Sequence, residues 1–261
     1  MKSYETLTLE KKEGIAEVCL NRPQVHNAFN EVVVKELTEV FNRLEKDEDV
    51  WLIILTGKGK SFCAGADLNW MKKMVNYSWE ENVADSLEMS KMFETIDRCP
   101  KPVLGKVNGS AFGGGVGLVC VCDIAVGCED SLFAFSEVKL GIIPAVISPY
   151  VAKRIGIART RELFLSGERI NGKRAAEIGL LNYAVKKEEL DSKVQEKVKF
   201  LRSSGRKAMK EVKRLLRKMT ELDPQSFKNF CAEKIAELRA SEEGQEGLAA
   251  FLEKRKPSWR R

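Results

Sequence analysis

The amino-acid sequence predicts a layered α/β fold that is followed by a helical region. Short apolar segments typical of buried strands alternate with helical segments through about 130 residues, which favours a sheet covered by helices. From about residue 188 the segments become long, charged and helical. We therefore expect an α/β core over residues 1–190 and a helical region over residues 191–261.

The spacing of apolar residues defines each expected element in order. Residues 7–11 and 14–20 predict a β-hairpin that ends at Pro23. Helical spacing follows at residues 30–45, and the continuous apolar run at 50–55 predicts a buried strand. Further strands are expected at 103–107, 124–126 and 132–135. Further helices are expected at 87–96, 116–121, 146–155, 158–165, 172–178, 190–201, 204–222 and 224–240.

Composition excludes several classes of protein. With 261 residues, 44% hydrophobic and 31% charged, the chain is typical of a globular protein. No apolar run approaches about 20 residues, and the first twelve residues are polar, so neither a membrane span nor a signal peptide is expected. We expect a cytoplasmic protein.

Cysteine and histidine content argue against a metal site. The seven cysteines include no C-x-x-C pair, so we expect reduced, mostly buried thiols. His26 is the only histidine, which rules out a site built from several histidines. The net charge of +6 suits an anionic partner, either a phosphate-bearing small molecule or a nucleic acid, without choosing between them.

A run of three glycines, Gly113-Gly114-Gly115, lies between two apolar segments. Each glycine inside a helix costs about 1 kcal/mol relative to alanine, so their placement needs a reason. Glycines let a ligand approach the backbone, and N–H groups at the start of a helix stabilise negative charge. The run therefore predicts a place where the backbone meets a ligand.

A second turn of small residues follows the strand at 50–55. Residues 56–66 read as a glycine-rich loop that ends in Ala64, Gly65 and Ala66, and an acid, Asp67, comes next. One interpretation is a tight turn in which Asp67 caps a helix. The other is functional: in a parallel sheet both turns lie at the same edge, and one N–H group from each would form an oxyanion hole.

Glu137 is the third candidate. It follows Phe133-Ala134-Phe135-Ser136 and precedes an apolar stretch. A carboxylate in such surroundings is either a satisfied structural acid or a group whose raised pKa suits it to proton transfer. The residues alone leave both interpretations open.

The motifs KSFCAGADLNWM, VNGSAFGGGVGLVCVCDIAV, FSEVKLGIIPAVISPYV and AFLEKRKPSW, together with LNRPQVHNAFN, resemble the crotonase family of enoyl-CoA hydratases and isomerases over essentially the whole chain. The ADLNWM and IIPAVISPYV segments look most like those of bacterial methylglutaconyl-CoA hydratases. The resemblance implies a spiral of ββα units and a helical C-terminal region that forms trimers, often paired into hexamers. It also implies an acyl-CoA thioester substrate and no cofactor beyond the coenzyme A of that substrate.

The resemblance also assigns residues. The N–H groups of Ala66 and Gly114 should hold the thioester oxygen, and Glu137 should exchange a proton at C2. The remaining assignments concern coenzyme A. They are Arg22, Gln24 and His26 in the early loop, Ala64, Asp67 and Leu68 beside pantetheine and adenine, and Phe251 and Lys254 from the C-terminal segment of the same or a neighbouring subunit.

One departure from the family pattern concerns the reaction. Two-glutamate hydratases carry a water-activating glutamate two residues after the third glycine, and this chain has Gly117 there. We expect a hydratase, in which Glu137, a substrate carboxylate or a helix acid (Glu80, Glu81 or Glu88) assists water. The alternative is a Δ3,Δ2-enoyl-CoA isomerase in which Glu137 alone moves the proton.

Ser148 and Tyr150 replace the family's glycine-rich turn. Their hydroxyls either contact a polar acyl tail or serve packing and helix capping, and we favour the second role.

Two other functions are disfavoured by the sequence. A dinucleotide fingerprint needs a small residue at position 118, where this chain has a leucine, and the motif is not at the start of a βαβ unit. Residues 207–218 form a basic helical segment that suits nucleic acid, but a stripe of apolar residues favours an amphipathic helix that packs one side and solvates the other.

Overall fold

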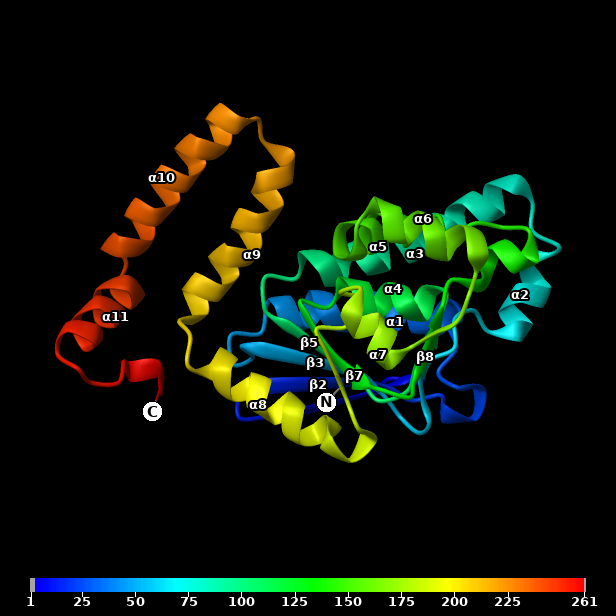
Figure 1. The fold of residues 1–261 in the computed structure, drawn as a ribbon, viewed down its shortest axis with the longest axis horizontal. Coiled ribbons are helices and arrows are strands. Elements are labelled where there is room, and N and C mark those ends of the chain that lie inside the picture. The colour runs from blue at the N-terminus through cyan, green and yellow to red at the C-terminus, as the bar shows by residue number, and fades with distance from the viewer. Residues whose placement is uncertain (1–2, 261) are drawn as a thin grey trace. The chain divides into compact units, whose positions relative to one another are not determined.

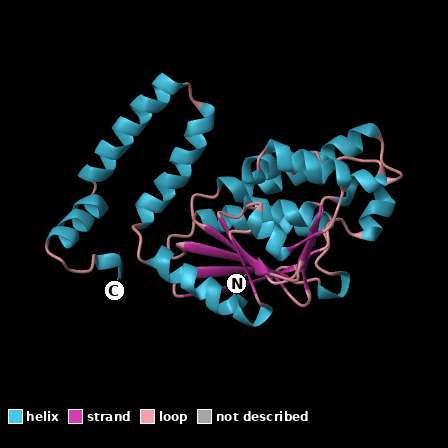
Figure 2. Cartoon of the chain, in the orientation of Figure 1, coloured by secondary structure: helices cyan, strands magenta, loops and turns pink. Residues whose placement is uncertain are grey.

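Two β-sheets organise the first part of the chain, as the computed structural model of residues 3–260 shows (Figures 1 and 2). The larger sheet has six strands, in the order β1 (Leu7–Lys12), β2 (Ile15–Leu20), β3 (Leu52–Gly57), β5 (Val103–Val107), β7 (Ile124–Cys128) and β10 (Tyr183–Val185). The smaller sheet has four strands, in the order β4 (Ser61–Cys63), β6 (Ser110–Phe112), β8 (Leu132–Ala134) and β9 (Ile170–Asn171).

Most strand pairs are parallel. In the larger sheet only the hairpin of β1 and β2 is antiparallel. In the smaller sheet β4, β6 and β8 are parallel, and β9 runs antiparallel to β8. Three successive segments each add one strand to the larger sheet, then one to the smaller sheet, and then a helical turn or helix. The carboxyl ends of β4, β6 and β8 therefore gather at one edge of the smaller sheet.

Helices cover the sheets in the first part of the chain (Figure 1). They are α1 (Glu31–Glu45), α2 (Leu68–Met74), α3 (Trp79–Arg98), α4 (Gly114–Val121), α5 (Ser148–Ile155), α6 (Ile157–Ser166) and α7 (Gly172–Glu177), with short 3-10 turns η1 (Pro23–Val25), η2 (Ser136–Leu140) and η3 (Lys187–Glu189). The C-terminal helices are α8 (Leu190–Arg202), α9 (Arg206–Glu221), α10 (Pro224–Ala240) and α11 (Glu242–Leu252), followed by η4 (Ser258–Arg260).

The helix α1 shows why the sequence folds this way locally. Asn30 caps it, because its side chain accepts the Val33 N–H at 3.0 Å. Its apolar residues at helical spacing are all buried. The helix α4 differs, because every residue from Gly115 to Val121 is buried. A helix that is apolar all round belongs in the core, and α4 accordingly packs against β4 and β6 of the smaller sheet and against α3 and α5.

Several short elements differ from the sequence-based expectations. The predicted loop 56–66 contains β4, and β6, β9 and β10 were also not expected. Strands of two or three residues are too short to show a period of two. The strand predicted at 50–55 lies at Leu52–Gly57 instead. The helix predicted at 87–96 begins earlier, at Trp79, behind a capping box in which Ser78 and Glu81 satisfy each other's backbone N–H groups.

The chain divides into two compact units. The first contains the chain up to Val194 except Pro100–Pro102, and the second contains Pro100–Pro102 and the chain from Gln195 onward. The boundary lies inside α8, a few residues beyond the sequence-based boundary. No helix within residues 3–260 is both long and apolar enough to span a membrane.

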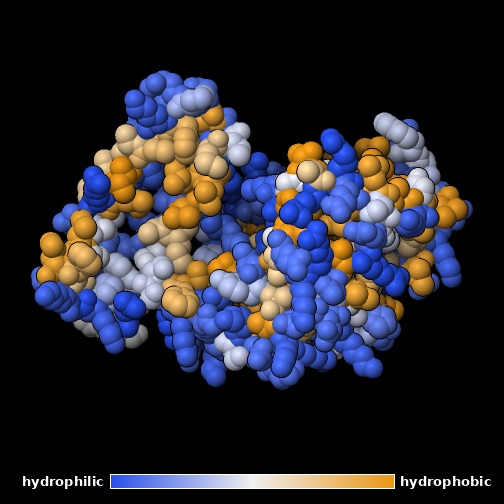
Figure 3. Space-filling model, viewed as in Figure 1, coloured by the Kyte–Doolittle hydropathy of each residue, from blue (hydrophilic) through white to orange (hydrophobic). Residues whose placement is uncertain are grey.

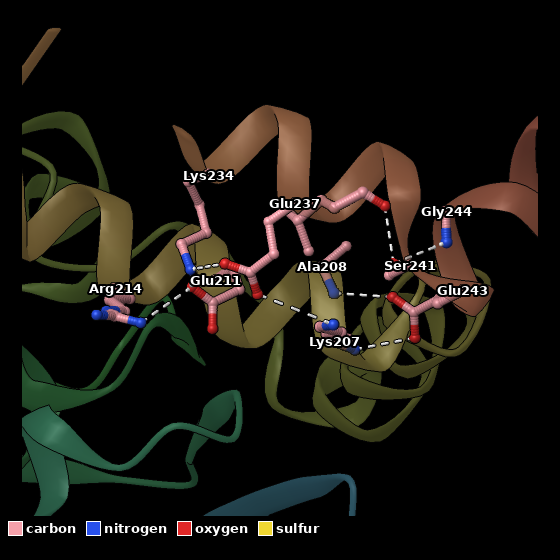
Figure 4. A network of polar contacts seen from close by, with 10 residues as sticks. Lys207, Ala208, Glu211, Arg214, Lys234, Glu237, Ser241, Glu243 and Gly244 are labelled. Atoms are coloured by element: carbon pink, nitrogen blue, oxygen red, sulfur yellow. Dashed lines mark hydrogen bonds and ion pairs between the residues drawn. The ribbon is translucent and has the colours of Figure 1, made fainter. Parts of the chain in front are cut away.

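A polar network joins the helices of the second unit (Figure 4). Glu243 accepts hydrogen bonds from the N–H groups of Lys207 and Ala208 at 3.0 and 2.8 Å, and so caps the start of α9. The buried carboxylate of Glu211 lies 3.5 Å from Lys234 on α10 and 3.7 Å from Arg214. These contacts tie α9 to α10 and to α11.

Candidate active site

The turns after β4 and β6 are packed against each other. The strands β4 and β6 pair in parallel, so both turns begin at the same edge. A β-carbon at Gly115 would lie 2.2 Å from the carbonyl oxygen of Cys63, and one at Gly65 would lie 2.9 Å from that of Phe112. These glycines allow the two turns to touch, as the sequence predicted.

The N–H groups of Ala66 and Gly114 take no part in the backbone hydrogen bonds that surround them within residues 3–260. Phe29 holds the first turn from both sides: its N–H donates to Gly65 O at 2.7 Å, and its carbonyl accepts the Asp67 N–H at 2.7 Å. Between these two bonds, the Ala66 N–H donates to no backbone carbonyl of residues 3–260. Gly114 is the first residue of α4, so its N–H has no acceptor within the helix.

Glu137 lies against the start of α4. Gly113 has φ +50° and ψ −123°, a conformation that favours glycine, and a β-carbon there would lie 2.9 Å from Glu137 Oε1. Oε2 is buried and finds no hydrogen-bond partner among residues 3–260. Burial raises the pKa of Glu137 above its ordinary value. A carboxylate with a raised pKa and a free lone pair is equipped to accept a proton.

The backbone around Glu137 is fixed by its neighbours. Ile142 donates its N–H to Glu137 O at 3.2 Å, and Gly113 donates its N–H to Ala134 O at 2.9 Å. The ring of Phe135 meets that of Phe164 edge-on, with centroids 4.8 Å apart. These contacts hold η2 in place, so the carboxylate is presented from a rigid turn.

The space beside Gly117 is filled, so no side chain fits at this position. A β-carbon there would lie 2.4 Å from Cγ2 of Ile147 and 2.9 Å from the ring of Phe93. Sequence reasoning missed both residues. Ile147 belongs to the segment that departs from the family's glycine-rich turn, and that departure was the available signal.

Ser148 and Tyr150 have the structural roles favoured by the sequence. The Ser148 hydroxyl donates to Ala145 O at 2.7 Å, in the turn that leads into α5. The Tyr150 ring lies 6.0 Å from that of Phe93, and burial raises the pKa of Tyr150 to about 12.

The helix acids belong to another surface. Glu81 caps α3, and Glu81 and Glu88 line a cavity of about 790 Å³ together with residues of α1. All three acids, Glu80, Glu81 and Glu88, are exposed.

The residues predicted to contact coenzyme A in the first unit gather around two loops. Arg22 and Asp67 form an ion pair of 2.9 Å, and Asp67 also caps α2 through the Asn69 N–H at 2.7 Å. His26 O accepts the Ala64 N–H at 3.0 Å, and its ring nitrogen Nδ1 lies 3.0 Å from Ser61 Oγ. Both Gln24, on η1, and Leu68, at the start of α2, are exposed.

Phe251 and Lys254 belong to the second unit. Phe251 lies near the end of α11 and is 81% exposed, which leaves its ring open to a ligand or a neighbouring subunit. Lys254 is exposed and has a left-handed backbone with φ +54°.

Comparison with known proteins identifies the family of the chain. The enoyl-CoA hydratase/isomerase family model matches residues 10–261. The chain is 33% identical over 250 residues to the short-chain-enoyl-CoA hydratase of Clostridium acetobutylicum, which is 95% of each protein. It is 37% identical over 186 residues to the enoyl-CoA hydratase AKT6-1 of Alternaria alternata, which covers 71% of this chain and 59% of that protein.

A solved structure shares the fold. The enoyl-CoA hydratase from Shewanella pealeana superposes with a TM-score of 0.93 at 40% identity, covering 98% of this chain and 96% of that one. The crotonase-type α/β fold expected from the sequence is confirmed. The chain belongs to the enoyl-CoA hydratase/isomerase family.

Proposed function

We propose that the protein is an enoyl-CoA hydratase that adds water reversibly to a 2-enoyl-CoA. The observation that carries this proposal is the place of Glu137, whose carboxylate lies against Gly113 directly beside the N–H of Gly114. A proton-transfer group thus stands next to a donor for the thioester oxygen. The relatives named above, two of them called enoyl-CoA hydratases and one a short-chain-enoyl-CoA hydratase, support it.

The proposed chemistry uses three groups of the chain. The N–H groups of Ala66 and Gly114 stabilise the negative charge that develops on the thioester oxygen, by about 3 kcal/mol each. Ionised Glu137 takes a proton from water as the water oxygen bonds to C3, and the electron pair of the double bond moves onto the thioester as an enolate. Glu137 then returns the proton to C2. This route needs no cofactor beyond the coenzyme A of the substrate.

The substrate we propose carries a branched or carboxylated acyl group, such as 3-methylglutaconyl-CoA. The side chains packed on the glycine face of α4 support the branched class. Phe29, Met89, Phe93 and Ile147 lie beside Gly114 and Gly117 and are apolar, and apolar surroundings suit an aliphatic branch of the acyl group.

The second candidate is a Δ3,Δ2-enoyl-CoA isomerase. The closed space beside Gly117 favours it, because the protein holds no second carboxylate there. In that reaction Glu137 takes a proton from C2 and returns it to C4.

Incubation with 3-methylglutaconyl-CoA, crotonyl-CoA and a 3-enoyl-CoA in ¹⁸O-labelled water tests both candidates. Uptake of label into the product shows hydration. A shifted double bond without label shows isomerisation, and no turnover of any of the three esters would disprove both proposals.

We also propose that the protein assembles into trimers or hexamers through its second unit. Apolar side chains gather on the surface over α9 and α10 (Figure 3). Val212, Leu216 and Met219 on α9 are each more than half exposed in the single chain, although they form the stripe expected to pack. A second copy of the chain would cover them.

A further inference from the structure

Three glycines lie along one side of α4. Gly113 is the N-cap, Gly114 is the first residue, and Gly117 follows them by four and three residues, so Gly117 lies on the same side of the helix as both. Each faces a different group: Gly113 faces Glu137, Gly114 faces Phe29 and Met89, and Gly117 faces Phe93 and Ile147. Along this side of α4 the chain therefore presents one carboxylate and otherwise apolar side chains.

Ile147 is the group that fills the space beside Gly117. A β-carbon at residue 117 would lie 2.4 Å from Ile147 Cγ2, far inside van der Waals contact. Ile147 is 2% exposed and precedes α5, so it has little room to withdraw. Phe93 is held by the rings of Phe29 and Tyr150, at centroid distances of 6.3 and 6.0 Å.

We propose that Ile147 is a specificity-determining residue that limits the site to one proton-transfer group. This inference rests on the proposed function, since it concerns the reaction at the same site. Ile147 makes the closest of these contacts, and the Phe93 ring edge makes the next. While Ile147 keeps its place, no side chain can project from residue 117 even if the Phe93 ring shifts, and Glu137 must serve every proton transfer. Hydration and the shift of the double bond then use the same carboxylate.

A carboxylate at residue 117 separates the two reactions. It would take the proton of water while the water oxygen bonds to C3, and Glu137 would deliver its own proton to C2. The double-bond shift involves no water, so the carboxylate at residue 117 does not accelerate it. Replacement of Ile147 by a smaller residue, combined with an acid at residue 117, should therefore raise the rate of hydration and leave the rate of the double-bond shift unchanged.

The test compares Gly117→Glu, Ile147→Gly and the double variant Gly117→Glu/Ile147→Gly. Ile157→Gly is the matched control, because Ile157 is exposed at the start of α6. We measure the ratio of ¹⁸O-labelled hydrated product to shifted, unlabelled product, and the thermal midpoint of each variant. Gly117→Glu alone should lower the midpoint sharply. The double variant should raise the ratio about 100-fold over Ile147→Gly, and Ile157→Gly should leave the ratio at the wild-type value.

Two results overturn the inference. One is a folded double variant whose ratio stays within about twofold of Ile147→Gly, well below the expected gain. The other is a Gly117→Glu protein as stable as wild type. If the double variant does not fold, Gly117→Ala is measured in the wild-type and the Ile147→Gly backgrounds. A stability loss from Gly117→Ala that is no smaller in the Ile147→Gly background overturns the inference too. A wild-type protein inactive in both reactions would instead defeat the proposed function.

Discussion

Arg22 and Asp67 form an ion pair of 2.9 Å beside Ala66, whose N–H is the proposed oxyanion donor. Arg22 Nη1 also donates to Ala28 O at 2.6 Å, and Asp67 accepts the Asn69 N–H at 2.7 Å. Burial opposes ionisation of Asp67, but the hydrogen bonds from Asn69 and Arg22 outweigh it and lower its pKa. The pair thus joins the loop after β2 to the start of α2 and fixes the turn that carries Ala66.

Replacement of Asp67 should separate its two roles. Asp67→Asn keeps a capping side chain but removes the charge that pairs with Arg22, whereas Asp67→Ala removes both. Because Arg22 is mostly buried, Asp67→Ala should lower the free energy of unfolding by about 3 kcal/mol, and Asp67→Asn by roughly half as much. Urea unfolding measures both. If Asp67→Ala has the same free energy of unfolding as wild type, the ion pair of Arg22 and Asp67 does not stabilise the fold.

Replacement of Glu137 should remove turnover and spare the fold. Glu137→Gln keeps the shape but cannot accept a proton, so kcat should fall by about 100-fold to 10,000-fold while CoA-ester binding stays close to wild type. Glu168→Gln, an exposed acid, is the control. Since burial raises the pKa of Glu137, its ionised form is disfavoured in the folded state. The thermal midpoint of Glu137→Gln at pH 7 should therefore equal or exceed that of wild type. If Glu137→Gln keeps the kcat of wild type, Glu137 is not the proton-transfer group.

Local signals in the sequence predicted the longer elements. The hairpin of β1 and β2, the helix α1 behind Asn30, and the strand Val103–Val107 follow from periodicity and capping within single segments. The helix α3 was predicted only in part, because its exposed first turns carry apolar residues such as Trp79 and Val83 that break a simple polar and apolar pattern. The capping box at Ser78 was the missed signal.

The sequence predicted the two backbone turns of the site and the candidate acid Glu137, but not the packing around them. The glycine run and the turn at Ala64–Gly65–Ala66 could be predicted because consecutive small residues between apolar segments indicate a tight turn. The packing of Ile147 against Gly117 was not, since it joins residues thirty positions apart through α4 and α5. A contact between a glycine and an apolar side chain thirty residues away leaves no local pattern.

The proposed assembly should depend on the exposed stripe of α9. Leu216→Lys places a charge where a second copy would bury apolar surface, so the assembly should dissociate. Light scattering measures the mass: wild type should have the mass of three or six chains and the variant that of one. Lys210→Ala, on the charged side of α9, should keep the wild-type mass. A wild-type monomer would disprove the proposed assembly.

Activity should fall on the acid side at a pH above the ordinary range of glutamate. The proposed mechanism needs ionised Glu137, and burial raises its pKa above 4.5. As the pH falls through this raised pKa, the carboxylate binds a proton and kcat/KM declines tenfold per unit. The profile is measured between pH 4 and 8 with a substrate that does not titrate there. An acid limb below 4.5 would show that a different group, or an unburied carboxylate, controls the reaction.

Gly113 should prove more sensitive to a methyl group than another glycine of positive φ. Gly141 has φ +74° and open space around it, so Gly141→Ala adds backbone strain of about 1 kcal/mol and no contact. Gly113→Ala adds strain as well, and its β-carbon would also lie 2.9 Å from Glu137 Oε1. The carboxylate must then move, so kcat should drop at least about tenfold more in Gly113→Ala than in Gly141→Ala. Comparison of kcat at equal folded fraction, set by circular dichroism, makes the test. Equal losses in the two variants would mean that Gly113 serves the backbone alone and that the position of Glu137 does not depend on it.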